Sequence, residues 1–524
     1  MYALRLLRRR RLRIKREVKS AARGGLLGFR AGRAALCELA TTLCLAAASA
    51  TSPTFAVSHD DSAAISRPST TSAVAAPPAD AAPIGTQTFT DHRNPPPYRK
   101  LSDAEFARYD LGMAVFNTQF VPAGTPNAGR RAGVGPLFNS SSCDACHNNG
   151  AHGRGPTGDG PASSPLVIQL ATTPTKNPTD PEGDPVYGRV LNTVALDGVS
   201  PEGEAMVHYQ ETPGHYPDGS AFSLRIPHYT LVNLRYGPMS PRTLVKPRLA
   251  PALFGAGLLD AAAIAAGGAG TDAAAISATE SASGEPRATP PEQAHAAANT
   301  NATTHVMPFE QSHGRFGWQA TALSVEDQTA RAFSREMGLT SSDIPHDDCT
   351  PAETACLHAP SNGSPEVSAE IFNAVLSFQR YLAVPASPTP HPILDRDAKT
   401  FTDLGCVACH QPRLPVTLTD ADGKDYAAVI APYTDLRLHD LGIRLADETV
   451  AGKKVQSKWR TAPLWGLGYR MTLEHFPTFL HDGRARSAEE AILWHDGEAT
   501  AARQNFEQLP APQRKDFLRW LETL

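Results

Sequence analysis

Hydrophobic positions along the chain follow two different periods, which predict helices in some segments and strands in others. Residues 103–117 place apolar side chains at helical spacing, and Ser102 with Glu105 forms the pattern of an N-terminal capping box. Short apolar runs divided by Pro and Gly predict strands within residues 165–235. The same helical period predicts further helices over 325–337, 368–382, 488–495 and 512–523.

The first 56 residues differ from the rest of the chain in charge. They hold 12 Lys and Arg residues against two acidic residues, and this basic region leads into an apolar run over residues 39–50. That order, with small residues after the run, is typical of an export signal, and the run is too short to span a bilayer. We therefore interpret residues 1–56 as a signal peptide and 57–97 as a flexible leader. An N-terminal membrane anchor is the alternative.

Removing that segment changes the charge of the protein. The whole chain carries −4 and residues 1–56 carry +10, so the remaining 468 residues carry −14. An acidic body of this kind argues against nucleic acid as a partner. No later segment reaches 18 apolar residues, so we expect no membrane span after processing.

Two segments share the pattern Cys-x-x-Cys-His, and roughly 0.004 such matches are expected by chance in a chain of this composition. The pattern attaches c-type haem, because the two thiols bond the two vinyl groups and the His ligates the iron. A Cys₄ zinc site would not need a His after both pairs, and a thioredoxin-like pair would sit in a βαβ context. We predict two covalently attached c-type haems, held by Cys143, Cys146 and His147, and by Cys406, Cys409 and His410.

The other four cysteines separate by position. Cys37 and Cys44 leave with the signal peptide, and Cys349 and Cys356 are expected to pair in an oxidising compartment, with two free thiols as the alternative. Covalent haem attachment in bacteria takes place on the far side of the membrane, which agrees with export. We therefore expect a periplasmic location.

Several segments resemble the bacterial di-haem oxidoreductase family, whose members are described as peroxidases or as thiol-oxidoreductase-like proteins. More distantly, the chain is similar to bacterial di-haem cytochrome c peroxidases and to the di-haem enzyme that matures methylamine dehydrogenase. The matching segments follow the family's order and cover most of residues 100–524. They are residues 136–150, 247–261, 314–341, 405–412, 432–442, 459–468 and 479–499.

The resemblance implies a second iron ligand for the second haem. In the distant relatives a His-Asp-Gly motif is followed, fourteen residues after its His, by an axial ligand. Here His481 opens that motif and His495 stands fourteen residues later. His495 is therefore the expected ligand, which would make this haem a bis-histidine, low-spin site. His495 as an ordinary surface histidine is the alternative, with His481 and His439 as the next candidate ligands.

The resemblance also implies a catalytic group beside the first haem. The relatives carry a Trp, then a Gln, then a Glu before Met, and Trp318, Gln328 and Glu336 fit this pattern, although Gln to Glu is eight residues rather than ten. Trp318 would conduct electrons between the haems, and Gln328 and Glu336 would handle peroxide. Breaking an O–O bond requires a group that moves a proton and a polar group that holds the departing oxygen. The alternative is that Trp318 is a residue of the hydrophobic core and that Glu336 is a solvated helix residue.

The chain also departs from its relatives. The 150–310 region is inserted between the motifs, and the stretch where the family often has an Asp/Gly-rich run suited to calcium is Ala-rich, which argues against calcium there. His152 lies only five residues past His147, too close to cross the ring and ligate the same iron. An open position at the first haem would suit catalysis.

We therefore predict a mainly α fold with two cytochrome c-like haem domains, the first carrying a β-containing insertion. The N-terminal haem domain would span 98–385, with 261–304 of low complexity, and the C-terminal one 386–524. The leading hypothesis is a periplasmic di-haem oxidoreductase of the peroxidase type. A small periplasmic electron-transfer protein would donate electrons, and hydrogen peroxide or another small oxidant would react at the first haem. The alternatives are a non-catalytic di-haem electron carrier and a haem-dependent oxidase of an organic or thiol substrate.

Overall fold

A computed structural model describes most of the chain after its first 76 residues, and all of the described residues belong to one compact unit, Ser72–Leu524. The predicted signal peptide lies outside the described residues, as do most of the predicted leader and most of the low-complexity segment. The described residues are 77–78, 81–88, 93–123, 125–126, 132–173, 181–262, 314–361, 363–387, 395–420, 422–455, 457–473 and 477–524.

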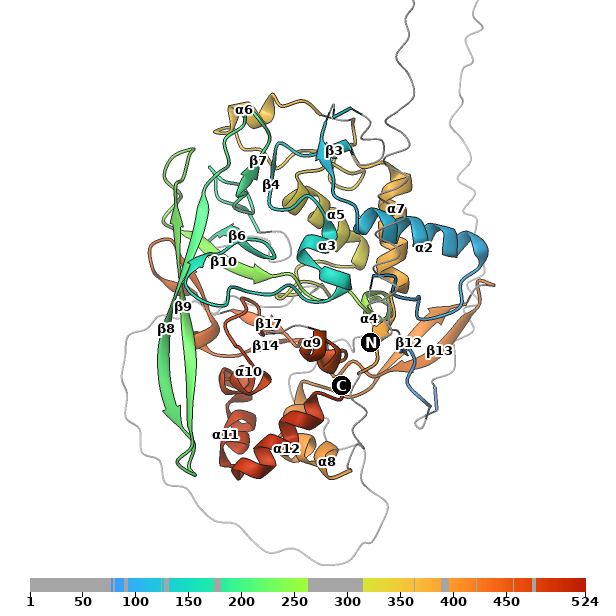
Figure 1. Cartoon of the computed structure of the whole chain (residues 1–524), viewed down its shortest axis with the longest axis vertical. Coiled ribbons are helices and arrows are strands. Elements are labelled where there is room, and N and C mark those ends of the chain that lie inside the picture. The colour runs from blue at the N-terminus through green and yellow to red at the C-terminus, as the bar shows by residue number, and fades with distance from the viewer. Residues whose placement is uncertain are drawn as a thin grey trace, which may run out of the picture. The chain divides into compact units, whose positions relative to one another are not determined.

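The prediction of a mainly α fold is wrong. Of the described residues, 29% are helical and 24% lie in strands, and the strands form several separate sheets (Figure 1). The prediction confined strands to residues 165–235, but a hairpin of β12 (Leu414–Thr419) and β13 (Asp425–Ile430) follows the second Cys-x-x-Cys-His motif. In β12 buried and exposed residues alternate strictly, so the period-2 signal was present in the sequence.

The predicted helices are present with nearly the predicted bounds. They are α2 (Asp103–Phe116), α5 (Val325–Met337), α7 (Ala369–Tyr381), α10 (Ala488–Leu493) and α12 (Ala511–Leu521). The capping box at Ser102 and Glu105 is formed in both directions. No helix in the described part of the chain has the length and apolar character needed to cross a membrane.

Helices α2 and α7 pack against each other. Gly112 allows their close approach, because a Cβ at this position would overlap the backbone carbonyl of Ala374. Phe116 and Phe378 then meet with ring centroids 5.1 Å apart, and Phe116 lies 6.4 Å from the ring of His147. The helix pair therefore forms an aromatic support beneath the histidine of the first motif.

Helix α5 ends against the segment that leads into the first motif. Gly338 adopts a left-handed conformation (φ 65°) and closes the helix, as is common for a residue at this position. The carbonyl of Glu336 then accepts hydrogen bonds from the backbone N–H groups of Asn139 and Ser140, just after β4 (Leu137–Phe138). These bonds fix the end of α5, and with it Glu336, beside residues 143–147.

A four-stranded sheet joins segments that are far apart in the sequence. Its strands are, in order, β16 (Lys454–Val455), β15 (Asp447–Thr449), β10 (Thr243–Leu249) and β6 (Leu166–Thr172), so β10 pairs with β15 across the predicted boundary at 385/386. Arg248 of β10 binds Asp447 of β15 through two hydrogen bonds of 2.8 and 2.7 Å, and both side chains are buried. A charged pair that is buried and hydrogen-bonded at both ends strongly favours one register for these strands.

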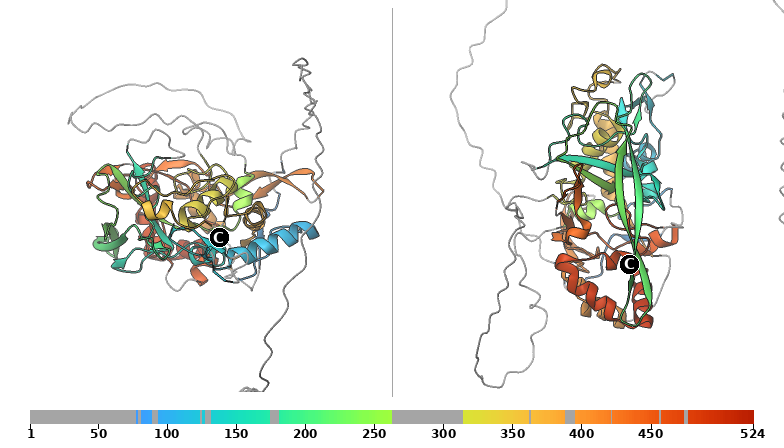
Figure 2. Two further views of the ribbon diagram at one scale, coloured as in Figure 1. Left: turned by 90° about the horizontal axis from the view of Figure 1, so that it is seen from above. Right: turned by 90° about the vertical axis from the view of Figure 1, so that its left-hand side faces the viewer.

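A long hairpin of β8 (Glu204–His215) and β9 (Ala221–Val232) runs along one side of the unit toward the C-terminal helices (Figure 2). Its far end is held by Tyr216, whose hydroxyl donates to Glu489 at 2.7 Å, and by an ion pair between Asp218 and Arg514. The other strands are β1 (Thr86–Gln87), β2 (Val121–Pro122), β3 (Ala132–Val134), β5 (Gly160–Pro161), β7 (Val194–Ala195), β11 (Val384–Pro385), β14 (Leu438–Asp440) and β17 (Lys458–Arg460). The other α-helices are α3 (Cys143–Cys146), α4 (Ala256–Asp260), α6 (Thr354–Leu357), α8 (Asp395–Asp403), α9 (Leu467–Leu473) and α11 (Thr500–Gln508).

Candidate functional site

The first Cys-x-x-Cys-His motif forms one helical turn, α3, which begins after a Ser142 N-cap. The ring of His147 follows it and makes a 2.7 Å hydrogen bond between Nδ1 and the carbonyl of Pro251. Burial lowers the pKa of His147 to about 4, so the ring is neutral and Nδ1 carries the proton that it donates. This tautomer leaves Nε2 as a lone-pair donor, which is the arrangement of a metal-ligating histidine.

Glu336 stands near the C-terminal end of α5, whose backbone there binds the segment that leads into this motif. It interacts electrostatically with Cys146, and its Oε2 atom is buried with no hydrogen-bond partner among the described residues. Burial raises the pKa of Glu336 to about 7, partly offset by the charge of Arg335. The alternative, that Glu336 is a solvated helix residue, therefore does not describe its surroundings.

Gln328 and Trp318 lie at the other end of α5. A Cβ on Gly317 would stand 3.7 Å from Oε1 of Gln328, so this side chain borders the loop that carries Trp318. The indole N–H of Trp318 donates to the carbonyl of Leu249 at 2.7 Å. Gln328 and Glu336 are eight residues apart, or about 12 Å along the helix axis, so they border different parts of the same region.

The second motif follows α8 and begins with a single 3₁₀ turn, Cys406–Ala408, with Gly405 in a left-handed conformation (φ 89°) just before it. Nδ1 of His410 makes a 3.0 Å hydrogen bond to the carbonyl of Tyr433, and burial lowers the pKa of His410 to about 4. Tyr433 has a positive φ of 54°, a conformation that is costly for a bulky residue. In this conformation the carbonyl of Tyr433 points at Nδ1 of His410. Nε2 of His410 is therefore available as a ligand.

His495 faces His410. Their ring centroids are 6.5 Å apart, and Nδ1 of His495 is bound to the carbonyl of Ala491 at 2.7 Å. Two imidazoles that ligate one metal ion from opposite sides have their ring centres about 6 Å apart, because each metal–nitrogen bond is about 2 Å long. His410 and His495 therefore have the separation and the free Nε2 atoms that a bis-histidine haem requires.

The two alternative ligands are engaged elsewhere. His439 binds Asp435 through Nε2 and Glu498 through Nδ1, each at 2.8 Å. His481 stacks on Trp459 with ring centroids 3.8 Å apart and planes 14° apart. Sequence reasoning gave Trp459 no role, although it begins the matching segment 459–468, because its contact with His481 depends on how distant elements pack.

The four motif cysteines carry no disulfide, whereas Cys349 and Cys356 are joined, which confirms their predicted pairing. Burial raises the pKa of Cys143 and of Cys406 to about 12, so neither thiol has the character of a redox-active thiolate. Thiols held neutral beside a histidine with a free Nε2 fit the chemistry of haem attachment.

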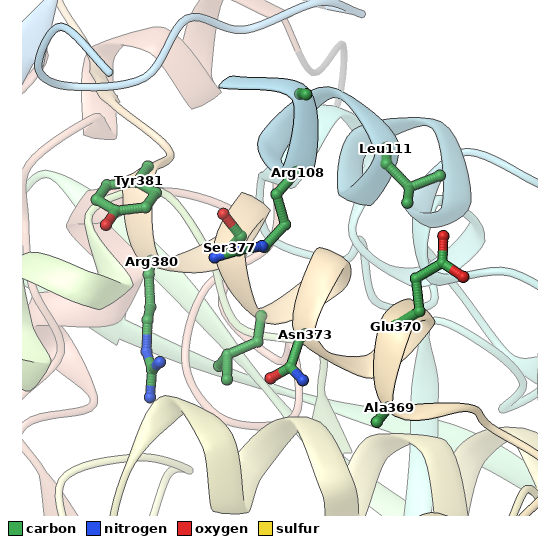
Figure 3. A pocket seen from close by; sticks show the side chains of 10 residues that line it. Arg108, Leu111, Ala369, Glu370, Asn373, Ser377, Arg380 and Tyr381 are labelled. Carbon is green, nitrogen blue, oxygen red and sulfur yellow. The ribbon is translucent and has the colours of Figure 1, made fainter. Parts of the chain in front are cut away.

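An open groove of about 680 Å³ lies elsewhere, between α2 and α7, and is lined by Arg108, Leu111, Asn373, Ser377 and Tyr381 (Figure 3). Arg380 extends from its edge toward α5, where its guanidinium donates to Glu326 at 2.9 Å. None of the predicted site residues lines this groove, so it does not belong to either motif.

Comparison with known proteins identifies the class of protein. The family model described as "Di-haem oxidoreductase, putative peroxidase" matches residues 82–168 and 196–524, so the chain belongs to this family. No curated protein matches the chain. Among solved structures, a xenon-pressurised hydrazine synthase from Kuenenia stuttgartiensis is similar at 18% identity and a TM-score of 0.22. That match covers 34% of this chain and 65% of that chain, and a similarity this weak carries no argument about fold or function.

Proposed function

We propose that this di-haem oxidoreductase is an exported, peroxidase-type enzyme with two covalently attached c-type haems. Cys143, Cys146 and His147 would hold the first haem. Cys406, Cys409 and His410 would hold the second, with His495 as its other axial ligand. Its electrons would come from a small periplasmic electron-transfer protein, which the −14 charge of the body would attract if that partner is basic.

One observation carries this proposal: the two histidines of the motifs have different surroundings. His410 faces a second imidazole at 6.5 Å, whereas the region of His147 contains Glu336, a buried carboxyl group with an unpaired oxygen. A saturated site suits electron transfer, and a site with a proton-active group suits reaction with a small oxidant. A simple carrier would not need this asymmetry.

A haem held by His147 would supply the redox chemistry of peroxide reduction at this site. The chain's own part is to move protons. Glu336, with a pKa of about 7, accepts a proton from the attacking peroxide as a carboxylate and returns it to the departing oxygen as an acid. Gln328 is polar but uncharged, and it would orient bound water at the other end of α5, about 12 Å along the helix from Glu336.

The proposal is tested by electron paramagnetic resonance of the ferric protein during a titration with hydrogen peroxide. We expect one low-spin bis-histidine signal that is indifferent to peroxide and a second signal that peroxide changes. Two low-spin signals that stay unchanged by cyanide and peroxide through a redox cycle would rule out the enzyme and leave a di-haem carrier.

The role of Glu336 has its own test in the pH profile of peroxide consumption. Turnover should rise with pH through about 7, as the carboxylate forms. Glu336→Gln should remove this rise and slow turnover by about 10²–10⁴-fold. Glu326→Gln, on the same helix but paired with Arg380 at the surface, is the matched control.

A further inference from the structure

Two buried glutamates, Glu202 and Glu353, lie against each other outside both Cys-x-x-Cys-His motifs. Their exposed fractions are 1% and 0%, and their carboxyl groups are hydrogen-bonded to each other. Both oxygens of Glu202 accept from Asn192, one from its backbone N–H at 2.6 Å and one from its side-chain amide at 3.1 Å. Oε2 of Glu353 accepts the backbone N–H of Thr350 at 2.6 Å. Oε1 of Glu353 is buried and receives no N–H or hydroxyl donor among the described residues.

A hydrogen bond between the two carboxyl groups requires a proton on one of them, because ionised carboxylates can only accept. Burial raises the pKa of Glu202 well above its usual range, and the charge of Glu353 adds to this shift. Burial also raises the pKa of Glu353. The pair therefore holds one shared proton under conditions in which an exposed glutamate has lost its own.

The surroundings of the pair offer no cation in place of that proton. Arg189 lies in the same region, but its guanidinium is bound to Asp348 at 3.2 Å, and the charge of Asp348 itself favours the protonated form of Glu353. The other ionisable groups that interact with the pair or with its neighbours are Tyr187, Tyr236 and Asp184. If the shared proton leaves, two buried carboxylates face each other and repel.

The pair joins two segments that are about 150 residues apart in the chain. Glu202 lies between β7 and β8, and its backbone N–H donates to the carbonyl of Asn192. Glu353 directly precedes α6 and lies inside the loop that the disulfide between Cys349 and Cys356 closes. The disulfide makes this loop one short unit, so a force on Glu353 acts on α6 as a whole.

The same two segments form walls of a groove of about 740 Å³. In Figure 1, α6 and β7 lie close together at one end of the unit. One wall contains Ala355 and His358, and the facing wall contains Leu196 and Val199. The groove continues to Ser141, which stands two residues before the first cysteine of the first motif. The carboxyl pair therefore links the walls of a groove that leads toward this motif.

We propose that Glu202 and Glu353 form a pH-sensitive latch, which holds the two walls of this groove together while the carboxyl groups share a proton and releases them when the proton leaves. The step transfers one proton from the pair to water and breaks no covalent bond. The latch is a property of the fold and does not depend on the proposed peroxidase reaction.

The direction of the pH dependence follows from proton binding. The closed latch keeps a proton that the separated glutamates release, so closure is most stable below the ordinary glutamate pKa of 4.5. Its stability is lost as the pH rises toward the raised pKa of the pair. Each pH unit in this window makes opening about tenfold easier.

Hydrogen–deuterium exchange of the holoprotein, followed by mass spectrometry at pH 5 and pH 8, measures the opening. The variant is Glu353→Gln, because its amide nitrogen can take the place of Oε1 and donate to Glu202 without titrating. The ratio of the wild-type to the variant exchange rate over residues 350–359 cancels the chemical effect of pH on exchange. His358 is present in both proteins, so its charge cancels as well. We expect this ratio to rise at least about tenfold from pH 5 to pH 8.

The control variant is Asp343→Asn, which removes an exposed carboxylate from the same part of the chain and should behave as the wild type does. Exchange in α12 should not differ between the proteins. If Glu353→Gln fails to fold, the wild type alone gives the result, because its exchange over 350–359 relative to α12 should rise by the same factor. A ratio that stays constant between the two pH values would overturn the latch, and so would an equal rise in α12, which indicates global unfolding.

Discussion

Glu336 makes a specific prediction about how stability depends on pH. Burial raises its pKa from 4.5 to about 7 in the folded chain. The folded state therefore prefers the protonated acid, and this contribution to stability is complete below pH 4.5 and is lost as the pH rises through 7. The shift is about 2.5 pH units, and at about 1.4 kcal/mol per unit the loss is roughly 3 kcal/mol.

Glu336→Gln keeps the shape of the side chain but cannot ionise. At pH 5 the variant and the wild type should unfold at similar temperatures, whereas at pH 8 the variant should be more stable by up to about 3 kcal/mol. Differential scanning calorimetry of both proteins at several pH values measures the difference. Glu326→Gln controls for the loss of one acidic residue from α5. A stability difference that does not grow between pH 5 and pH 8 would show that Glu336 is not a buried acid.

Three further predictions concern other parts of the chain. His495→Ala should convert the second haem from low-spin to high-spin or exchange its ligand, while the exposed His358→Ala should not, and an unchanged spectrum would exclude His495 as a ligand. Gly112→Ala should cost about 1–3 kcal/mol and lower the melting temperature, because the new Cβ would overlap Ala374, whereas Gly158→Ala meets open space and should be nearly neutral. Cys349→Ser with Cys356→Ser should cost about 2 kcal/mol in calorimetry but leave both haem spectra intact, and a change in those spectra would contradict a purely structural bridge.

The helices could be predicted from the sequence because their signals are local. Ser102 with Glu105, the apolar period of 325–337 and Ser487 each act within one or two turns, and α2, α5 and α10 begin or end where these signals lie. The fold class could not be predicted in the same way. The strands β10 and β15 are stabilised by pairing between residues about 200 positions apart, which no local window contains.

In the candidate site, too, local sequence patterns could be predicted and contacts between distant segments could not. The two Cys-x-x-Cys-His motifs are contiguous in the sequence, and the separation of His481 and His495 was taken from a resemblance. The contact of Trp459 with His481 and the burial of Glu336 near Cys146 could not be predicted from local patterns, because both depend on which elements pack together. Tertiary packing, rather than residue type, decides whether a glutamate at the end of a helix is solvated or buried.

The sheet β16-β15-β10-β6 has a consequence for the order in which the protein matures. Its last two strands, residues 447–455, follow both Cys-x-x-Cys-His segments in the chain. When the chain emerges with its N-terminal end first, the sheet cannot close before residues 143–147 and 406–410 have both emerged. Arg248 has to wait for Asp447 before it can be buried with a partner. Both motifs therefore emerge while the core is still open, and closure of the sheet afterwards would enclose the haems that we propose they hold.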